Sequence, residues 1–252
     1  MEAAGLTRPR VPAGNTATAW LKIIALVFMF IDHAGKMFFP NVPEMRMLGR
    51  IAYPIYVWCM IVGFHYTRSV PKYLLRVLLV GLISQPLYNI ALRHTWQEPN
   101  VFLNLFLGLC ALWGIREKKY LSYIWAPAAA LILATLLNAD YGWKGILLFI
   151  LLYAARDSRP GIAAVMVAVF LFWGSFYGVT KSFFGISFNV NTLDPSLSKP
   201  LSSLLRMETY ALLSLPFILI RFKKDLKLPR WVGYTIYPAH LVVLYVLEQI
   251  FK

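Results

Sequence analysis

The sequence predicts an all-α membrane protein, a polytopic bundle of about nine transmembrane helices. Hydrophobic residues make up 59% of the 252 positions and charged residues only 14%, and the mean hydropathy is +0.62. Apolar runs of helical length recur along the whole chain and are separated by short polar connections. This composition excludes an ordinary water-soluble domain of the same length.

Each apolar run is a candidate for one membrane crossing, which takes about 20 residues of perpendicular helix. The runs cover residues 17–40, 49–67, 73–92, 100–115, 120–138, 142–155, 160–178, 201–220 and 231–251. The fourth and sixth runs are short, so these helices are expected to tilt, to be re-entrant or to extend into flanking polar residues. The longest connection, about residues 179–200, joins the seventh run to the eighth.

The charges predict how the chain is oriented. Most of the 25 lysines and arginines fall in connections on the same side as the N-terminus, which places that side in the cytoplasm. Residues 1–16 are then a short, loose, polar cytoplasmic tail, and residues 17–252 form one multi-pass domain of the cytoplasmic membrane with its C-terminus outside. The first apolar run lacks a small-residue cleavage site, so we interpret it as a retained span.

Several function classes lack their motifs. The net charge is +14, but no basic segment interleaved with aromatic residues indicates nucleic-acid binding. No HExxH, CxxC or clustered His/Cys pattern predicts a metal site, and Cys59 and Cys110 each lie within an apolar run, as packing residues do. GxGxxG, P-loop and GxSxG motifs do not occur. An imidazole is therefore the best candidate for a reactive group.

Polar residues collect toward the outer leaflet when the chain is threaded in this way. Taken singly, a lysine or arginine at a helix end usually extends to the interface, and an asparagine within a span usually hydrogen-bonds a neighbouring helix. Together, residues from six helices predict a shared polar cavity that opens outward, because ionisable groups in spans usually face protein or water. The set is Asp32, His33, Lys36, Arg50, Gln85, Asn89, Asn100, Asn104, Asp140, Lys144, Arg206 and Glu208.

His33 is the leading catalytic candidate. It lies in KIIALVFMFIDHAGK, where Asp32, His33 and Lys36 share one helical turn. Histidine is well suited to take a proton from an amine or hydroxyl near neutral pH, and Asp32 can orient it or serve another partner. Lys22 precedes His33 by eleven residues, about 16 Å along a helix and nearly in line with it, so one stripe joins the inner face to His33.

The last run contains GYTIYPAHLVVLY, which places Tyr234, Tyr237 and His240 on one side of a helix. These residues are either the wall of a site or a Tyr/His contact that fills a packing gap near Pro238. Both interpretations stay open at this point. The other histidines, at 65 and 94, lie at the ends of runs and are interpreted as structural or solvated.

Several blocks together resemble the TraX family, in order from about residue 17 to the C-terminus. They are KIIALVFMFIDHAGKMFF, MLGRIAYPIYVWCMIVGF, SQPLYNIAL, NVFLNLFLGLCALW, DYGWKGILLFILLY and TIYPAHLVVLY. The resemblance implies an integral membrane protein similar to transmembrane acyltransferases, with acetylation of a pilin N-terminal amine as the best-known activity. In the acyltransferase-3 branch of that group an Arg-x10-His pattern marks the first helix. Here Lys22 replaces the arginine, and lysine cannot form the same two-pronged hydrogen bond.

The resemblance also implies roles for the polar residues. The expected reaction transfers acetyl from cytosolic acetyl-CoA, without a metal, to an extracytoplasmic amine or hydroxyl such as a pilin N-terminus or an envelope glycan. The expected catalytic residues are His33 and Asp32. Contacts to acetyl-CoA are expected from Lys22, Lys36, Arg50, Tyr237 and His240, and contacts to the acceptor from Gln85, Asn89, Asn104, Asp140 and Lys144.

Two other functions fit the same pattern. A proton-coupled transporter or lipid carrier would use Asp32, His33 and Asp140 as a proton relay. A non-enzymatic pilus or envelope assembly factor would use the polar residues only to hold its helices together.

Overall fold

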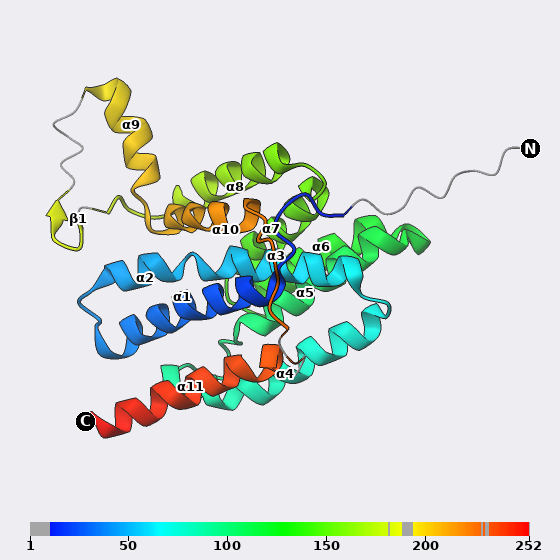
Figure 1. The fold of residues 1–252 in the computed structure, drawn as a ribbon, viewed down its shortest axis with the longest axis horizontal. Helices are drawn as coiled ribbons and strands as arrows, with labels where there is room; N and C mark the ends of the chain where they lie inside the picture. The colour runs from blue at the N-terminus through cyan, green and yellow to red at the C-terminus, as the bar shows by residue number, and fades with distance from the viewer. Residues whose placement is uncertain (1–10, 181, 188–193, 228, 230–231, 252) are drawn as a thin grey trace, which may run out of the picture.

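The computed structural model describes residues 11–180, 182–187, 194–227, 229 and 232–251, and helices dominate this part of the chain (Figure 1). The elements are α1 Thr18–Phe38, α2 Pro43–Gly49, α3 Ala52–Tyr66, α4 Val70–Leu92, α5 Val101–Glu117, η1 Lys119–Leu121, α6 Ser122–Leu136, α7 Gly142–Ala155, α8 Arg159–Gly174, β1 Ser182–Phe183, β2 Ile186–Ser187, α9 Pro195–Leu204, η3 Met207–Ser214, α10 Leu215–Leu219 and α11 Val232–Ile250. Every one of the nine predicted runs contains helix, and the all-α fold class is confirmed. The strands β1 and β2 form a short antiparallel hairpin.

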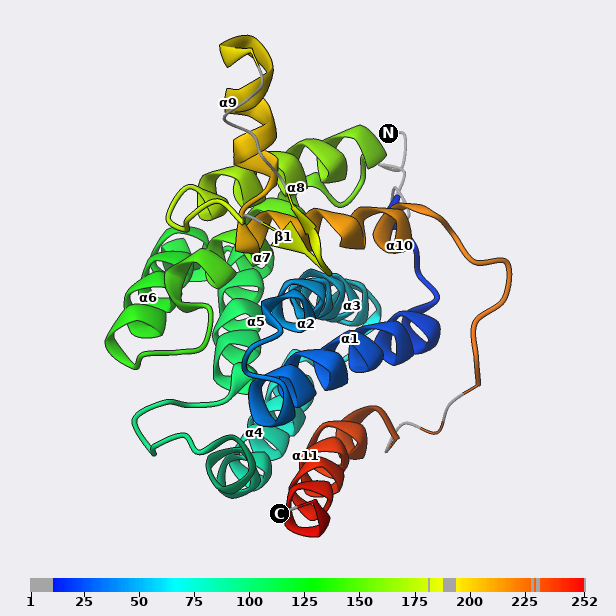
Figure 2. The same ribbon diagram turned by 90° about the vertical axis from the view of Figure 1, so that its left-hand side faces the viewer.

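Helix α3 is the centre of the bundle. It is apolar on all sides, and Ile55, Trp58, Ile61 and Phe64 are fully buried. Figure 2 shows α1, α4, α5, α7 and α10 arranged around it, with α6 and α11 at the periphery and α9 projecting away from the bundle. A helix without a polar face is stable only when neighbours or lipid cover it. In this structure the surrounding helices cover the apolar surface of α3.

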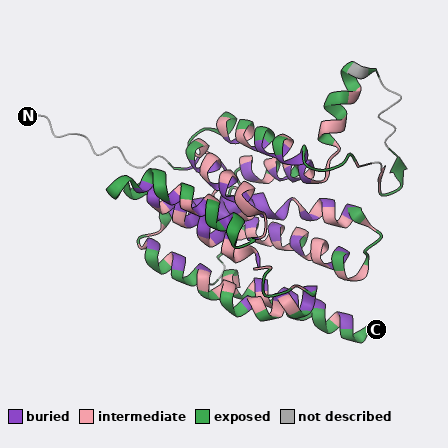
Figure 3. Cartoon of the chain, turned by 180° about the vertical axis from the view of Figure 1, so that it is seen from behind, coloured by how far each residue is buried: buried purple, intermediate pink, exposed green. Residues whose placement is uncertain are grey.

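Apolar side chains also cover much of the outer surface. Leu82 and Ile83 of α4, Ile132 and Leu136 of α6, and Val243 of α11 are exposed, and these peripheral helices show mostly exposed outer faces (Figure 3). Within the described residues, three helical segments are long and apolar enough to cross a membrane: Pro43–Tyr66, Val70–Leu92 and Lys119–Leu136. These features agree with a membrane protein, and the number of nine crossings stays a prediction.

The eighth predicted run differs from the single helix expected over residues 201–220. Helix α9 ends at Leu204, Arg206 is extended and pairs with Val179, and the chain continues as the 3₁₀-helix η3 and the short helix α10. Pro216, the second residue of α10, lacks the N–H that a continuous α-helix would need. Three short elements therefore replace one helix.

The described part of the predicted N-terminal tail packs into the bundle. Asn15 is 1% exposed, its N–H donates to the Ile218 carbonyl at 2.6 Å, and its carbonyl accepts from the Trp58 indole at 2.7 Å. A side chain on Gly14 would collide with the Trp58 ring. Residues 11–16 are thus held against α3 and α10 rather than loose, and residues 1–10 lie outside the described part.

Helix α1 defines two ends of the bundle. Its N-terminal part carries Lys22 and its last turn carries Lys36, and we call these the Lys22 end and the Lys36 end. At the Lys22 end the Asp225 carboxylate accepts hydrogen bonds from the N–H groups of Ala19 and Trp20, at 3.2 and 3.4 Å. A carboxylate at this position satisfies free N–H groups of the first turn and complements the helix dipole.

Candidate active site

A small polar cavity lies inside the bundle on the Lys36 side of α3. Its volume is about 40 Å³, which is room for one or a few water molecules. Helix α1 contributes its catalytic candidates, α3 contributes tyrosines, and α4, α11 and the α6–α7 connection close the remaining sides. The lining residues are Met29, Asp32, His33, Gly49, Ala52, Tyr53, Tyr56, Tyr88, Val101, Asp140, Tyr141 and Tyr237.

His33 forms a pair with His240. Nδ1 of His33 lies 2.9 Å from Nε2 of His240, and the two rings stack with centroids 5.1 Å apart. One ring must donate and the other accept in this bond, so the pair holds a proton between two imidazoles. Tyr237, one turn before His240, packs edge-on against the His240 ring at 5.1 Å. Of the predicted Tyr/His face of the last run, Tyr237 and His240 therefore lie toward His33, whereas Tyr234 lines the hollow beside Lys22.

Asp32 takes another partner. Its Oδ2 accepts from Arg46 of α2 at 3.0 Å, whereas its Oδ1 is buried without a hydrogen-bond partner. The hydroxyl of Tyr56, on the same cavity, is also buried and unpartnered. Buried polar atoms in folded proteins nearly always have a partner. These two atoms therefore indicate that the cavity receives a polar occupant.

Aromatic rings build the wall toward α7. Tyr53 and Tyr141 stack with centroids 3.7 Å apart. The Tyr53 hydroxyl donates to Asn104 Oδ1 at 2.5 Å, and Asn104 Nδ2 donates to the Gly142 carbonyl at 2.8 Å. Asn104 is fully buried, so these bonds fix the start of α7 against α3 and α5. Asn104 thus supports the wall and does not itself line the cavity.

Asp140 connects the cavity to a second hollow. It lies in the α6–α7 connection, where Tyr141 and Gly142 have positive φ angles. Burial raises the pKa of Asp140 to about 6, against the opposing effect of Arg50. The second hollow has a volume of about 260 Å³ and shares Tyr88, Asp140 and Tyr141 with the central cavity. Asp140 therefore lies on the boundary between the two spaces.

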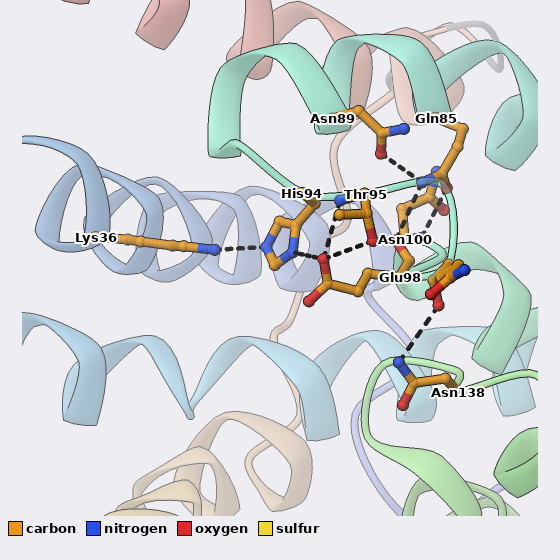
Figure 4. Close-up of polar contacts among 9 residues, drawn as sticks. Lys36, Gln85, Asn89, His94, Thr95, Glu98, Asn100 and Asn138 are labelled. Atoms are coloured by element: carbon orange, nitrogen blue, oxygen red, sulfur yellow. Dashed lines mark hydrogen bonds and ion pairs between the residues drawn. The ribbon is translucent and has the colours of Figure 1, made fainter.

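The connection between α4 and α5 forms the far side of this second hollow. There Lys36 Nζ donates to His94 Nε2 at 2.5 Å, and His94 Nδ1 lies 3.3 Å from Glu98 Oε2 (Figure 4). His94 and Glu98 also line a third hollow of about 350 Å³ at the Lys36 end. Three titratable groups from two elements are thus linked at the mouth of the site.

Lys22 lies at a separate hollow. This space of about 280 Å³ is lined by the start of α1, the α10–α11 connection and the start of α11, including Lys22, Asp225 and Gly233. Ile236 lines it and the next residue, Tyr237, lines the central cavity. Among the described hollows, none includes both Lys22 and His33, so α11 forms a partition between them.

The remaining predicted site residues have partners away from the central cavity. Arg50 pairs with Glu208 at 3.4 Å, and Lys144 lies 3.8 Å above the Phe176 ring. Gln85 donates to Asn89 at 2.8 Å and to the Glu98 carbonyl at 3.1 Å, which holds the α4–α5 connection on α4. The structure therefore brings together Asp32, His33, Asp140, Tyr237 and His240. It places Lys36, Arg50, Gln85, Asn89, Asn104 and Lys144 around them, and Lys22 at a separate hollow.

Sequence reasoning missed several residues of the site. Tyr56 and Tyr88 gave no signal beyond an aromatic residue in an apolar run, and Arg46 lies 14 residues from Asp32. Tyr141 was visible as the neighbour of Asp140. His94 and Glu98 are four residues apart, but in a connection rather than a helix, so their spacing does not imply contact.

Comparison with known proteins identifies the family. The family model described as TraX protein matches residues 17–248. The chain belongs to the TraX family. Protein TraX of Escherichia coli is 28% identical over 160 residues, which cover 59% of this chain and 62% of that protein.

Two further relatives match parts of this TraX chain. An uncharacterised protein of Rickettsia prowazekii is 27% identical over 156 residues, 60% of each chain. A probable fimbrial assembly protein, FimC of Dichelobacter nodosus, is 35% identical over 106 residues, 36% of this chain and 43% of that protein. The aligned segments thus span less than two thirds of each of these relatives. No solved structure matches the chain.

Proposed function

We propose that this member of the TraX family is an acyltransferase of the cytoplasmic membrane, with nine crossings and the Lys36 end outside. It transfers acetyl from acetyl-CoA to an amine or hydroxyl on the extracytoplasmic side. The observation that carries the proposal is the His33–His240 pair at a cavity whose Asp32 Oδ1 and Tyr56 hydroxyl lack partners. A buried imidazole pair beside unsatisfied polar atoms suits proton transfer to a polar occupant.

The reaction sets what the chain must do. The C–S bond of the thioester breaks, a C–N or C–O bond forms, the acceptor loses a proton and the thiolate gains one. The His33–His240 pair can take the acceptor's proton on a ring nitrogen outside their shared hydrogen bond, and the protonated pair can then give it to the thiolate. Asp32 lines the same cavity and is held by Arg46, so it acts on the charge of the cavity rather than as a direct partner of His33.

The Lys22 end suits the donor. Lys22 lines the 280 Å³ hollow, and Lys223, Lys224 and Lys227 are exposed in the connection beside it. Ammonium groups attract the phosphates of coenzyme A. For the thioester to reach His33, α11 must move aside at Ile236 and Tyr237, where it separates the Lys22 hollow from the central cavity. Pro238 follows directly and lacks an N–H, so the helix is short of one internal hydrogen bond there.

The decisive experiment uses purified protein, labelled acetyl-CoA and native cell-envelope extract. We expect the wild type to label an envelope molecule and His33→Ala to abolish labelling while the variant stays inserted and folded. General acid–base groups contribute about 10²–10⁴-fold in rate. His65→Ala is the matched control, because His65 is the last-turn histidine of α3 and lines none of the hollows described above.

Other outcomes separate the alternatives. Full transfer by His33→Ala would contradict the assignment of His33. A wild type that labels nothing but carries a pH-driven solute flux in liposomes would be a transporter. Unchanged envelope assembly in cells that carry His33→Ala would favour an assembly factor, the role that the printed name of the Dichelobacter relative gives to that protein.

A further inference from the structure

We propose that His94, held by Glu98, is a second base that activates the acceptor in the 260 Å³ hollow at the Lys36 end. This inference rests on the proposed acyl transfer and adds where the acceptor binds and which group takes its proton. The acceptor class is a nucleophile that donates a hydrogen bond, an amine or a hydroxyl. His33 and His240 then serve the leaving thiol.

The hydrogen bonds around His94 determine its tautomer. A lysine ammonium has only donors, so Nε2 of His94 must accept from Lys36 and Nδ1 must carry the hydrogen. Nδ1 lies 3.3 Å from Glu98 Oε2. A neutral imidazole that accepts at one nitrogen and has a carboxylate beside the other is the arrangement of a general base with an orienting group.

Glu98 is itself held in place. Its Oε2 accepts from the N–H and the hydroxyl of Thr95, at 2.9 and 3.1 Å, and its carbonyl accepts from Gln85 at 3.1 Å (Figure 4). The ring of Tyr88 stacks on His94 with centroids 4.5 Å apart. The base is therefore fixed from both sides although it lies in a connection between helices. Such support is what a catalytic group needs.

Lys36 marks where the acceptor would bind. Its exposed side chain already presents a primary amine to Nε2 of His94 at 2.5 Å. Lys36 lines the 350 Å³ hollow together with His94 and Glu98. His94 and Glu98 also line the 260 Å³ hollow with Tyr88, Asp140 and Tyr141, so an acceptor in that hollow can replace the amine at His94. The last three residues also line the cavity of His33. The acceptor would thus contact the base and border the site of the thioester.

Displacement of Lys36 also makes His94 a stronger base. Burial and the Lys36 ammonium lower the pKa of His94 below its ordinary value, Arg46 of α2 lowers it further, and Glu98 raises it. Glu248 of α11 is the other carboxylate on the adjoining third hollow. When the ammonium leaves, the raising effect of Glu98 remains. The base is therefore weak at rest and stronger with the acceptor bound.

Exchange of protons with water restores both bases after each transfer. The acceptor N–H or O–H donates to His94 Nε2, and its proton moves to His94 as the new bond to the acetyl carbon forms. The C–S bond breaks, and the thiolate takes a proton from the His33–His240 pair, which solvent has first protonated. His94 then releases its proton to water and the pair regains one, so the net reaction is the transfer of acetyl and hydrogen between acceptor and thiol.

The test replaces His94 by glutamine, which keeps a hydrogen-bonding side chain but cannot carry the proton. With labelled acetyl-CoA and cell-envelope extract, we expect transfer by His94→Gln to fall about 10²–10⁴-fold. Binding of acetyl-CoA, measured as its protection against thermal unfolding, stays at the wild-type level. Imidazole added to His94→Ala should restore part of the rate. The matched control is His65→Gln, which keeps the wild-type rate.

Two further variants test the neighbours. Glu98→Gln should lower kcat without changing KM for acetyl-CoA, because Glu98 is a positioning residue for the base. Lys36→Met should raise transfer at low extract concentration, because the acceptor no longer competes with the amine. A higher KM for acetyl-CoA in Lys36→Met would instead make Lys36 a donor contact and contradict this inference. Hydroxylamine distinguishes the acceptor classes, since it removes acetyl esters and leaves amides.

The outcomes are separable. A wild-type rate in His94→Gln overturns the inference and leaves the proposed function intact. A loss of transfer that is matched by lost acetyl-CoA protection, or is not rescued by imidazole, makes His94 structural and also overturns it. A wild type that labels nothing contradicts the proposed function and this inference together.

Discussion

Replacing Gly49 by alanine tests how closely α2 approaches α1 at the site. A Cβ on Gly49 would lie 2.5 Å from Cγ of Asp32 and closer still to its Cβ and Oδ1. Carbon atoms in contact are separated by about 3.5–4.0 Å, so either Asp32 or the helix must move by roughly 1 Å. Gly49→Ala therefore changes the position of the Asp32 carboxylate relative to Arg46 and the cavity.

The expected cost is that of overpacking, about 1–3 kcal/mol in the free energy of unfolding. For a chain of this length each kcal/mol lowers Tm by roughly 2–4 °C. Thermal unfolding in detergent measures the change. Gly178→Ala is the matched control, because a Cβ there would meet no atom within 4 Å and its Tm should stay near that of the wild type.

A double-mutant cycle gives the decisive reading. Asp32→Gly removes the colliding atoms at the expense of about 1 kcal/mol for glycine within a helix. In that background Gly49→Ala should cost little, so the coupling free energy should be about 1–3 kcal/mol in favour of the double variant. If Gly49→Ala lowers Tm equally with Asp32 and with glycine at position 32, the two helices do not meet as described.

Two other residues of the site give predictions on stability. The raised pKa of Asp140, about 6, lies above its unfolded value of about 3.9, so the folded protein loses stability as pH rises from about 4 to 6. The loss is about 3 kcal/mol at most, and Asp140→Asn should abolish it in thermal unfolding at pH 4 and pH 7; an equal decline in both proteins would contradict the raised pKa. Asn104→Ala should cost about 2–4 kcal/mol, because it leaves the Tyr53 hydroxyl and the Gly142 carbonyl buried and unpaired. Gln249→Ala, an exposed amide within α11, is its control and should stay within about 0.5 kcal/mol of the wild type.

The sequence predicted the helices well because most of them lie within one continuous run of apolar residues. The prediction failed where an apolar run also contains residues that interrupt an α-helix. Residues 201–220 are apolar enough for a helix, but Pro216 and the extended Arg206 divide them into three elements. Residues 11–16 lack apolar character and were expected to be loose. Their order comes from hydrogen bonds of the Asn15 backbone and side chain to α10, which no local sequence pattern predicts.

The site was predictable as a region and not as a set of contacts. Depth along the spans correctly brought Asp32, His33 and Asp140 to one cavity, because helix length fixes depth. Partner choice depends on how helices rotate and pack. Asp32 and Lys36 lie one turn apart, yet one pairs with Arg46 of α2 and the other with His94 after α4. Neither partner is close in sequence, so neither could be read from the motif.

Helix α11 borders both the hollow at the Lys22 end and the central cavity. Ile236 borders the Lys22 hollow, Tyr237 borders the central cavity and His240 bonds His33, all within two turns of α11. Near its C-terminal end, Glu248 pairs with Arg93 after α4 at 2.5 Å. A donor that enters from the Lys22 end must therefore displace the element that completes the imidazole pair. Donor entry and the state of His33 are coupled through one helix, so the proposed chemistry at His33 requires α11 to return after the donor has passed.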